Sequence, residues 1–155
     1  MHFRISGLSA EPFRPLYGLS DQELRRRGVQ RHVADCKPGF PDRIEMRDAD
    51  IGQQLLLLNH VCQPADTPYR ATHAIFVREG AEETYDRTDQ VPEVMRTRLL
   101  SLRAFASSGM MLDADVIDGG GVETIIARFF GHSAIAYIHA HNAKRGCYSG
   151  RIDRA

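Results

Sequence analysis

The sequence predicts an α+β fold with a mainly antiparallel, curved or barrel-like sheet and two or three helices. Two observations lead to this prediction. Short segments of alternating or continuous apolar character recur along the 155 residues, and most follow one another directly instead of alternating with helices. Few segments have the three-to-four-residue apolar spacing of a helix. The length is typical of one domain, so we expect a single domain over residues 1–155.

The first half of the chain is expected to hold one helix and five strands. Ser20 and Glu23 form a capping box for a short helix that ends at Gly28. Proline and glycine interrupt the chain between the apolar segments, so each segment is short. The strands are expected at residues 3–7, 29–35, 43–46, 55–58 and 72–77.

The second half contains the clearest periodic segments. Residues 99–106 could continue a helix that starts near Pro92, but their alternation favours a strand, as it does for residues 110–116. Apolar side chains recur at helical spacing over residues 122–130, which predicts an amphipathic helix that Gly131 ends. The last segments, 134–141 and 147–152, are expected to pair as a hairpin.

Charge and cysteine content narrow the classes of function. Twenty basic and twenty acidic side chains cancel, which argues against nucleic-acid binding and membrane-surface attachment. The longest apolar run, residues 55–58, is far shorter than the roughly 20 residues of a membrane span, and no export signal is visible. Cys36, Cys62 and Cys147 form no C-x-x-C pair, so free thiols in a reducing cytoplasm are expected.

The C-terminal hairpin is the first candidate site. Strand alternation places Tyr137, His139 and His141 on one face. With a five-residue loop at 142–146, His141 is expected to stand opposite Cys147 on that same face. Two histidines at i and i+2 on a strand can bind one divalent metal ion if a neighbouring strand adds a third ligand.

The third metal ligand is expected to be Asp113, Asp115 or His73. The same hairpin also fits catalysis, because Cys147 beside His141 is a minimal nucleophile and base pair. The candidate catalytic residues are therefore His139, His141 and Cys147. A solvated hairpin face with polar histidines and a half-buried structural cysteine explains the same pattern.

A second group of residues could bind a small polar or anionic ligand. Arg70 lies where a loop enters a strand and could fork onto a carboxylate or phosphate, although a carboxylate of the chain itself is an equally good partner. The candidate ligand-binding residues are Tyr69, Arg70, His73 and Arg145.

Several stretches of the sequence also resemble a known family. They include F-R-I-S-G-L, L-L-L-L-N, P-Y-R-A-T-H-A-I-F-V-R-E-G, L-L-S-L-R-A-F, M-M-L-D-A-D-V and Y-I-H-A-H-N-A-K-R-G-C-Y. Together they are similar to domain of unknown function family 1203 (DUF1203) over nearly the whole chain. The resemblance implies a bacterial, cytoplasmic, stand-alone domain and implies no reaction.

Two classes of function follow from these observations. The first is a small enzyme or ligand-binding domain that uses His139, His141 and Cys147, with Arg70 as the anion anchor. The second is a non-catalytic interaction module that contacts a partner, or a second copy as a homodimer, through an exposed sheet edge.

Overall fold

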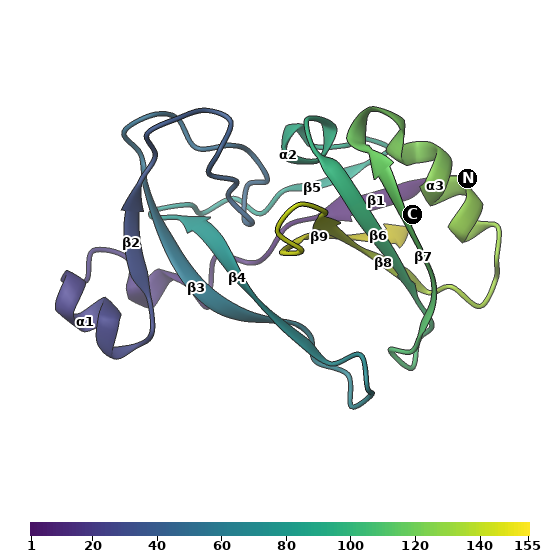
Figure 1. The fold of residues 1–155 in the computed structure, drawn as a ribbon, viewed down its shortest axis with the longest axis horizontal. Helices are drawn as coiled ribbons and strands as arrows, with labels where there is room; N and C mark the ends of the chain where they lie inside the picture. Colours follow the sequence, from purple (N-terminus) through teal and green to yellow (C-terminus); the bar gives the residue numbers. More distant parts are fainter.

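The computed structural model describes residues 1–155 and contains two antiparallel sheets and three α-helices (Figure 1). The six-stranded sheet has the order β5-β1-β9-β8-β6-β7, and the three-stranded sheet has the order β2-β3-β4. The α+β prediction is confirmed, with a curved sheet that does not close into a barrel. The elements are β1 (Phe3–Ser6), α1 (Asp21–Arg26), β2 (Gln30–Val33), β3 (Gln54–Gln63), β4 (Ala71–Arg78), β5 (Asp86–Thr88), α2 (Glu93–Arg96), β6 (Leu99–Phe105), β7 (Met111–Asp118), α3 (Val122–Phe130), β8 (Tyr137–Asn142) and β9 (Tyr148–Arg154).

One face of the six-stranded sheet is covered by α3 (Figure 1). The predicted apolar stripe is confirmed, because α3 buries Val122, Ile125, Ile126, Phe129 and Phe130, and Gly131 caps it. These side chains join the largest core cluster, which includes Leu100 and Leu102 of β6. No helix in the chain has the length and apolar character needed to cross a bilayer. The histidines of the candidate functional site lie on the opposite face of this sheet.

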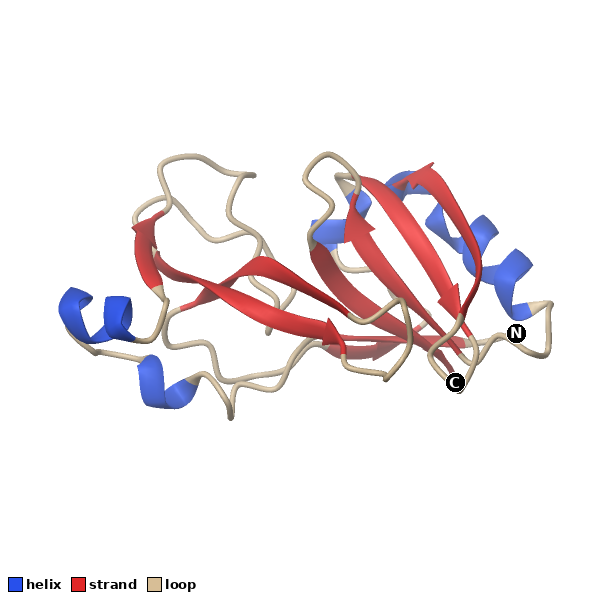
Figure 2. Ribbon diagram, turned by 60° about the horizontal axis from the view of Figure 1, so that its bottom comes forward, coloured by secondary structure: helices blue, strands red, loops and turns tan.

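The three-stranded sheet has its own core. Leu56 and Leu58 of β3 pack with Leu24 of α1, and the Ser20 hydroxyl caps α1 by accepting from the Glu23 amide, as predicted. Tyr148 of β9 belongs to the same cluster. Figure 2 shows the long β3–β4 hairpin beside the six-stranded sheet. Because Tyr148 belongs to β9 and packs in the core of the three-stranded sheet, it connects the two sheets.

Two segments differ from the predicted elements. Residues 43–46 form no strand, because the chain bends there and Met46 has a φ of 54°. The three-residue strand β5 was not predicted, since its sequence, Asp-Arg-Thr, is polar throughout. Its pairing with β1, with Ile5 opposite Arg87, depends on backbone hydrogen bonds that leave no apolar pattern.

Candidate functional site

The C-terminal hairpin places three of the predicted side chains on one face. The rings of Tyr137 and His139 are 5.2 Å apart, and those of His139 and His141 are 6.4 Å apart. The pairing of these side chains with β9 changes register between Ala140 and His141. His139 therefore stands opposite Arg151, and His141 stands opposite Tyr148.

The predicted pairing of Cys147 with His141 is wrong. The Asn142 amide donates to the Cys147 carbonyl at 2.9 Å, so Cys147 pairs with Asn142 instead of with His141. Because Tyr148 shares the face of His141, the adjacent Cys147 side chain points to the other face. The role of Cys147 as a nucleophile stays a prediction, but His141 lies on the other face and is not positioned to act as its base.

Cys147 contacts a buried cation on that other face. Arg43, 2% exposed, donates to the carbonyls of Pro41 and Tyr148 at 2.8 and 2.9 Å and to the Cys147 sulfur at 3.1 Å. Burial lowers the pKa of Arg43, and the Cys147 sulfur opposes that shift. This arrangement ties the irregular segment near residue 43 to the start of β9.

A second cluster joins the two sheets and contains potential metal ligands. Cys62 of β3, His73 of β4 and His141 of β8 each offer one ligand atom, and these atoms lie within 4.8 Å of one another. The rings of His73 and His141 are 5.0 Å apart, in an edge-to-face arrangement. Of the three residues predicted to complete the pair of His139 and His141, His73 is the one that the structure brings to His141. His139 is not part of this cluster, in which Cys62 supplies the remaining ligand atom.

The ring nitrogens of these histidines are in a state suited to metal binding. His141 Nδ1 lies 2.9 Å from the Gly146 carbonyl, which can only accept, so Nδ1 carries the proton and Nε2 keeps a free lone pair. The Nε2 atom of His73 is buried and has no hydrogen-bond partner. A buried polar atom without a partner is costly, and a bound cation would satisfy it.

Burial keeps the histidines of the site neutral. Burial lowers the pKa of His141 to about 3 and that of His139 to about 4, and it also lowers the pKa of His73. The charge of Arg103 adds to the lowering at all three histidines. Neutral imidazoles are the form that binds metal. Burial raises the pKa of the Cys62 thiol, so a metal would have to displace its proton.

Asp113 and Asp115 lie away from this cluster. On β7, Ala114 is opposite Arg103, whereas Asp115 is opposite Leu102, which belongs to the core beneath α3. Asp115 accordingly pairs with Arg128 of α3 at 2.8 Å, and Asp113 shares its face. Both aspartates are excluded as ligands that act together with His141.

The predicted ligand-binding residues are dispersed. Tyr69, Arg70 and Arg145 are exposed on loops, and only His73 lies in the cluster. Arg70 donates to the Pro64 carbonyl of its own loop at 2.5 Å. The structure thus does not join Arg70 to the hairpin face.

The sequence-based prediction missed Cys62 and Arg103. Cys62 lies at a register shift between Val61 and Gln63, where it packs inside the core of the three-stranded sheet. Its closeness to His141 depends on how the two sheets pack, which no local pattern encodes. Arg103 lies directly opposite His139 on the neighbouring strand β6. A correct prediction of the register between β6 and β8 would therefore have identified Arg103.

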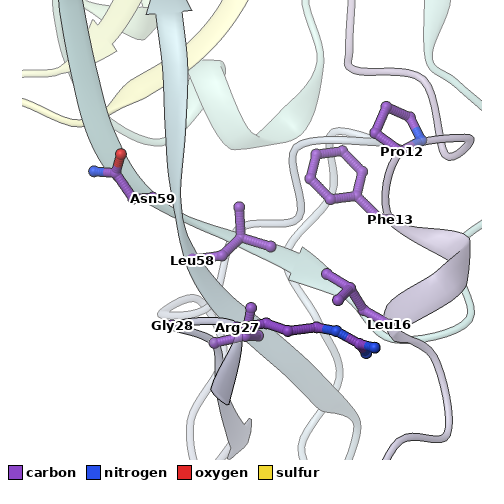
Figure 3. A pocket seen from close by; sticks show the side chains of 8 residues that line it. Pro12, Phe13, Leu16, Arg27, Gly28, Leu58 and Asn59 are labelled. Carbon is purple, nitrogen blue, oxygen red and sulfur yellow. The ribbon is translucent and has the colours of Figure 1, made fainter. Parts of the chain in front are cut away.

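Two surface depressions that share lining residues lie beside the three-stranded sheet. The first, about 310 Å³, is lined by side chains that include Phe13, Leu16, Leu58 and Asn59 (Figure 3). The second, about 390 Å³, shares Phe13 and Leu58 and reaches His60. His60, which lines the second depression, is opposite His73 of the cluster, and its ring is 5.9 Å from that of Tyr148.

Comparison with known proteins gives one match. A family model described as "Protein of unknown function (DUF1203)" matches residues 39–154. The match includes Cys62, His73, Arg103 and His141. No curated protein and no solved structure matches the chain.

Proposed function

The chain belongs to the DUF1203 family, whose description assigns no activity, and we propose that it binds a divalent transition-metal ion, zinc in the first instance, at Cys62, His73 and His141. The observation that carries the proposal is the convergence of these three ligand atoms within 4.8 Å at the junction of the sheets. The ion serves to bind, or to act on, a small polar or anionic ligand.

The chemistry of the ligand set favours zinc over magnesium or calcium. One thiolate and two imidazoles are ligands for zinc and similar metals, whereas magnesium and calcium prefer oxygen. Ligand atoms of a tetrahedral zinc ion lie roughly 3.5 Å apart, so the three side chains need to close by roughly 1 Å. Three protein ligands leave one coordination position for a water or a substrate, as in catalytic zinc sites.

The proposal is tested by zinc titration against a competing chelator, on protein purified without an affinity tag. We expect one zinc ion per chain, and we expect Cys62→Ser, His73→Ala and His141→Ala each to weaken binding at least about 100-fold, since each removes a direct ligand. His132→Ala is the matched control, because His132 is exposed and lies outside the cluster.

Equal zinc affinity in the wild-type protein and all three ligand variants would exclude this site. Circular dichroism of each metal-free variant separates the loss of a ligand from the loss of the fold.

The state of the thiols bears on where the protein would work. Cys36, Cys62 and Cys147 are all free, and a thiolate ligand must stay reduced. A bacterial cytoplasm, which the family resemblance implies, meets this requirement.

The alternative function is a non-catalytic interaction module, with self-association as its simplest form. The edge strand β7 exposes about half of Leu112 (47%) and Val116 (55%). An edge strand with exposed apolar side chains can pair with the same strand of a second copy. Native mass spectrometry at micromolar concentration tests this alternative, which predicts a dimer that Val116→Lys disrupts.

A further inference from the structure

Arg103 is a charged side chain of the site face without an acidic partner. It is opposite His139 on one side and Ala114 on the other, so its side chain shares the face of the histidines. Its side chain makes one hydrogen bond, to the Ser101 hydroxyl at 3.4 Å. By contrast, Arg151 on the same face pairs with Asp153 at 2.8 Å. The guanidinium of Arg103 therefore has donors available for another group.

His139 has a second available polar atom beside Arg103. The His139 side chain is buried, at 3% exposure, between the rings of Phe105, Tyr137 and Tyr148. Its Nδ1 atom is buried and has no hydrogen-bond partner. Nearly all buried polar atoms in proteins have a partner, so this atom points to a ligand that completes the site.

The charges of the metal centre indicate the kind of ligand. A divalent ion with one thiolate and two neutral imidazoles keeps a net positive charge, and Arg103 adds to it. No carboxylate belongs to the cluster of metal ligands. The open fourth position of the ion would therefore favour an anion over a neutral water.

We propose that the metal centre binds a small oxyanion, a carboxylate or a phosphate, with one oxygen on the ion and another on the Arg103 guanidinium. The Nδ1 atom of His139 can donate a further hydrogen bond to it. Arginine is suited to this role because its planar fork matches two oxygens of a carboxylate or phosphate. This inference rests on the proposed metal site and assigns to Arg103 the anchoring role that the sequence suggested for Arg70.

The test uses the full chain loaded with cobalt(II), whose visible spectrum reports on its coordination. Inorganic phosphate and acetate are titrated separately into the loaded protein, and the two series distinguish phosphate from carboxylate recognition. We expect a saturable spectral change with at least one anion. Arg103→Gln should weaken the binding of that anion about tenfold or more, because it removes a charged hydrogen bond.

Two further variants make the result specific. Arg70→Gln is the matched control and should keep the wild-type anion affinity within about twofold, since Arg70 is exposed and bound to its own loop. Arg103→Lys keeps the charge without the fork and should bind the anion with intermediate affinity. Each variant must first bind the same number of cobalt ions per chain as the wild-type protein. This measurement also shows that the variant is folded.

The inference is overturned if neither anion changes the cobalt spectrum, or if Arg103→Gln binds the anion as tightly as the wild-type protein. A wild-type chain that takes up no cobalt would instead refute the metal site itself, and the inference with it. The two failures are distinguishable because cobalt uptake is measured before any anion is added.

Discussion

The two ring nitrogens of His141 are in different environments, and this difference determines what the residue can do. Nδ1 contacts the Gly146 carbonyl, while Nε2 is left as the atom that a metal would bind. Sequence alternation correctly placed Tyr137, His139 and His141 together, because that relation is local. The tautomer and the contact with Cys62 could not be predicted, since both depend on a turn and on another sheet.

Acid should destabilise the metal-free protein through its buried histidines. The folded pKa values, about 4 for His139 and about 3 for His141, lie below the ordinary value near 6.5. Between these values the unfolded chain binds more protons than the folded chain, so stability is present above pH 6.5 and is lost as the pH falls. From pH 7 to pH 5 we expect a loss on the order of 3 kcal/mol.

Urea unfolding at both pH values measures this loss. His139→Gln removes one of the two titrating groups and should make the pH dependence shallower. A free energy of unfolding that stays constant between pH 7 and pH 5 would show that these histidines are not buried as described.

At the scale of elements, the hairpin shows how a one-residue change in strand register changes a predicted site. Strand periodicity located β8 and β9, and helical periodicity located α3, because each pattern is contained in its own segment. The turn pairs Cys147 with Asn142 instead of His141, and this one-residue shift reversed the predicted direction of the Cys147 side chain. Such shifts depend on backbone hydrogen bonding and leave no mark on hydrophobic alternation.

The three consecutive glycines between β7 and α3 should differ in importance. A Cβ at Gly119 would lie 1.7 Å from the Met95 carbonyl oxygen and 2.9 Å from that of Arg98. Both are backbone atoms, the first within α2 and the second just after it. Gly119→Ala must therefore shift the backbone, and we expect a loss of about 3 kcal/mol or more in chemical unfolding.

Gly121→Ala is the matched control for this prediction. The nearest atom to its Cβ would be Cδ1 of Ile117 at 3.5 Å, an ordinary contact. We expect a change below about 1 kcal/mol. Equal effects of the two substitutions would contradict the close approach of Gly119 to the α2 segment.

At the scale of the whole molecule, the candidate site exists only where the two sheets meet. Cys62 and His73 come from the three-stranded sheet, and His141 comes from the six-stranded sheet. The succession of strand-like and helix-like segments along the sequence was enough to predict the fold class. The docking of one sheet on the other was not predictable, because it depends on contacts such as His60 with Tyr148 between residues far apart in sequence.

X-ray absorption spectroscopy of the zinc-loaded chain tests the metal site most directly, because it identifies the atoms bound to the ion. The account predicts one sulfur at about 2.3 Å and two imidazole nitrogens at about 2.0 Å, with a further light-atom ligand. In Cys62→Ser the sulfur contribution should disappear, while Cys36→Ser should leave it unchanged because Cys36 is exposed and outside the cluster. A zinc ion bound only by oxygen and nitrogen in the wild-type protein, or a sulfur signal that persists in Cys62→Ser, would contradict it.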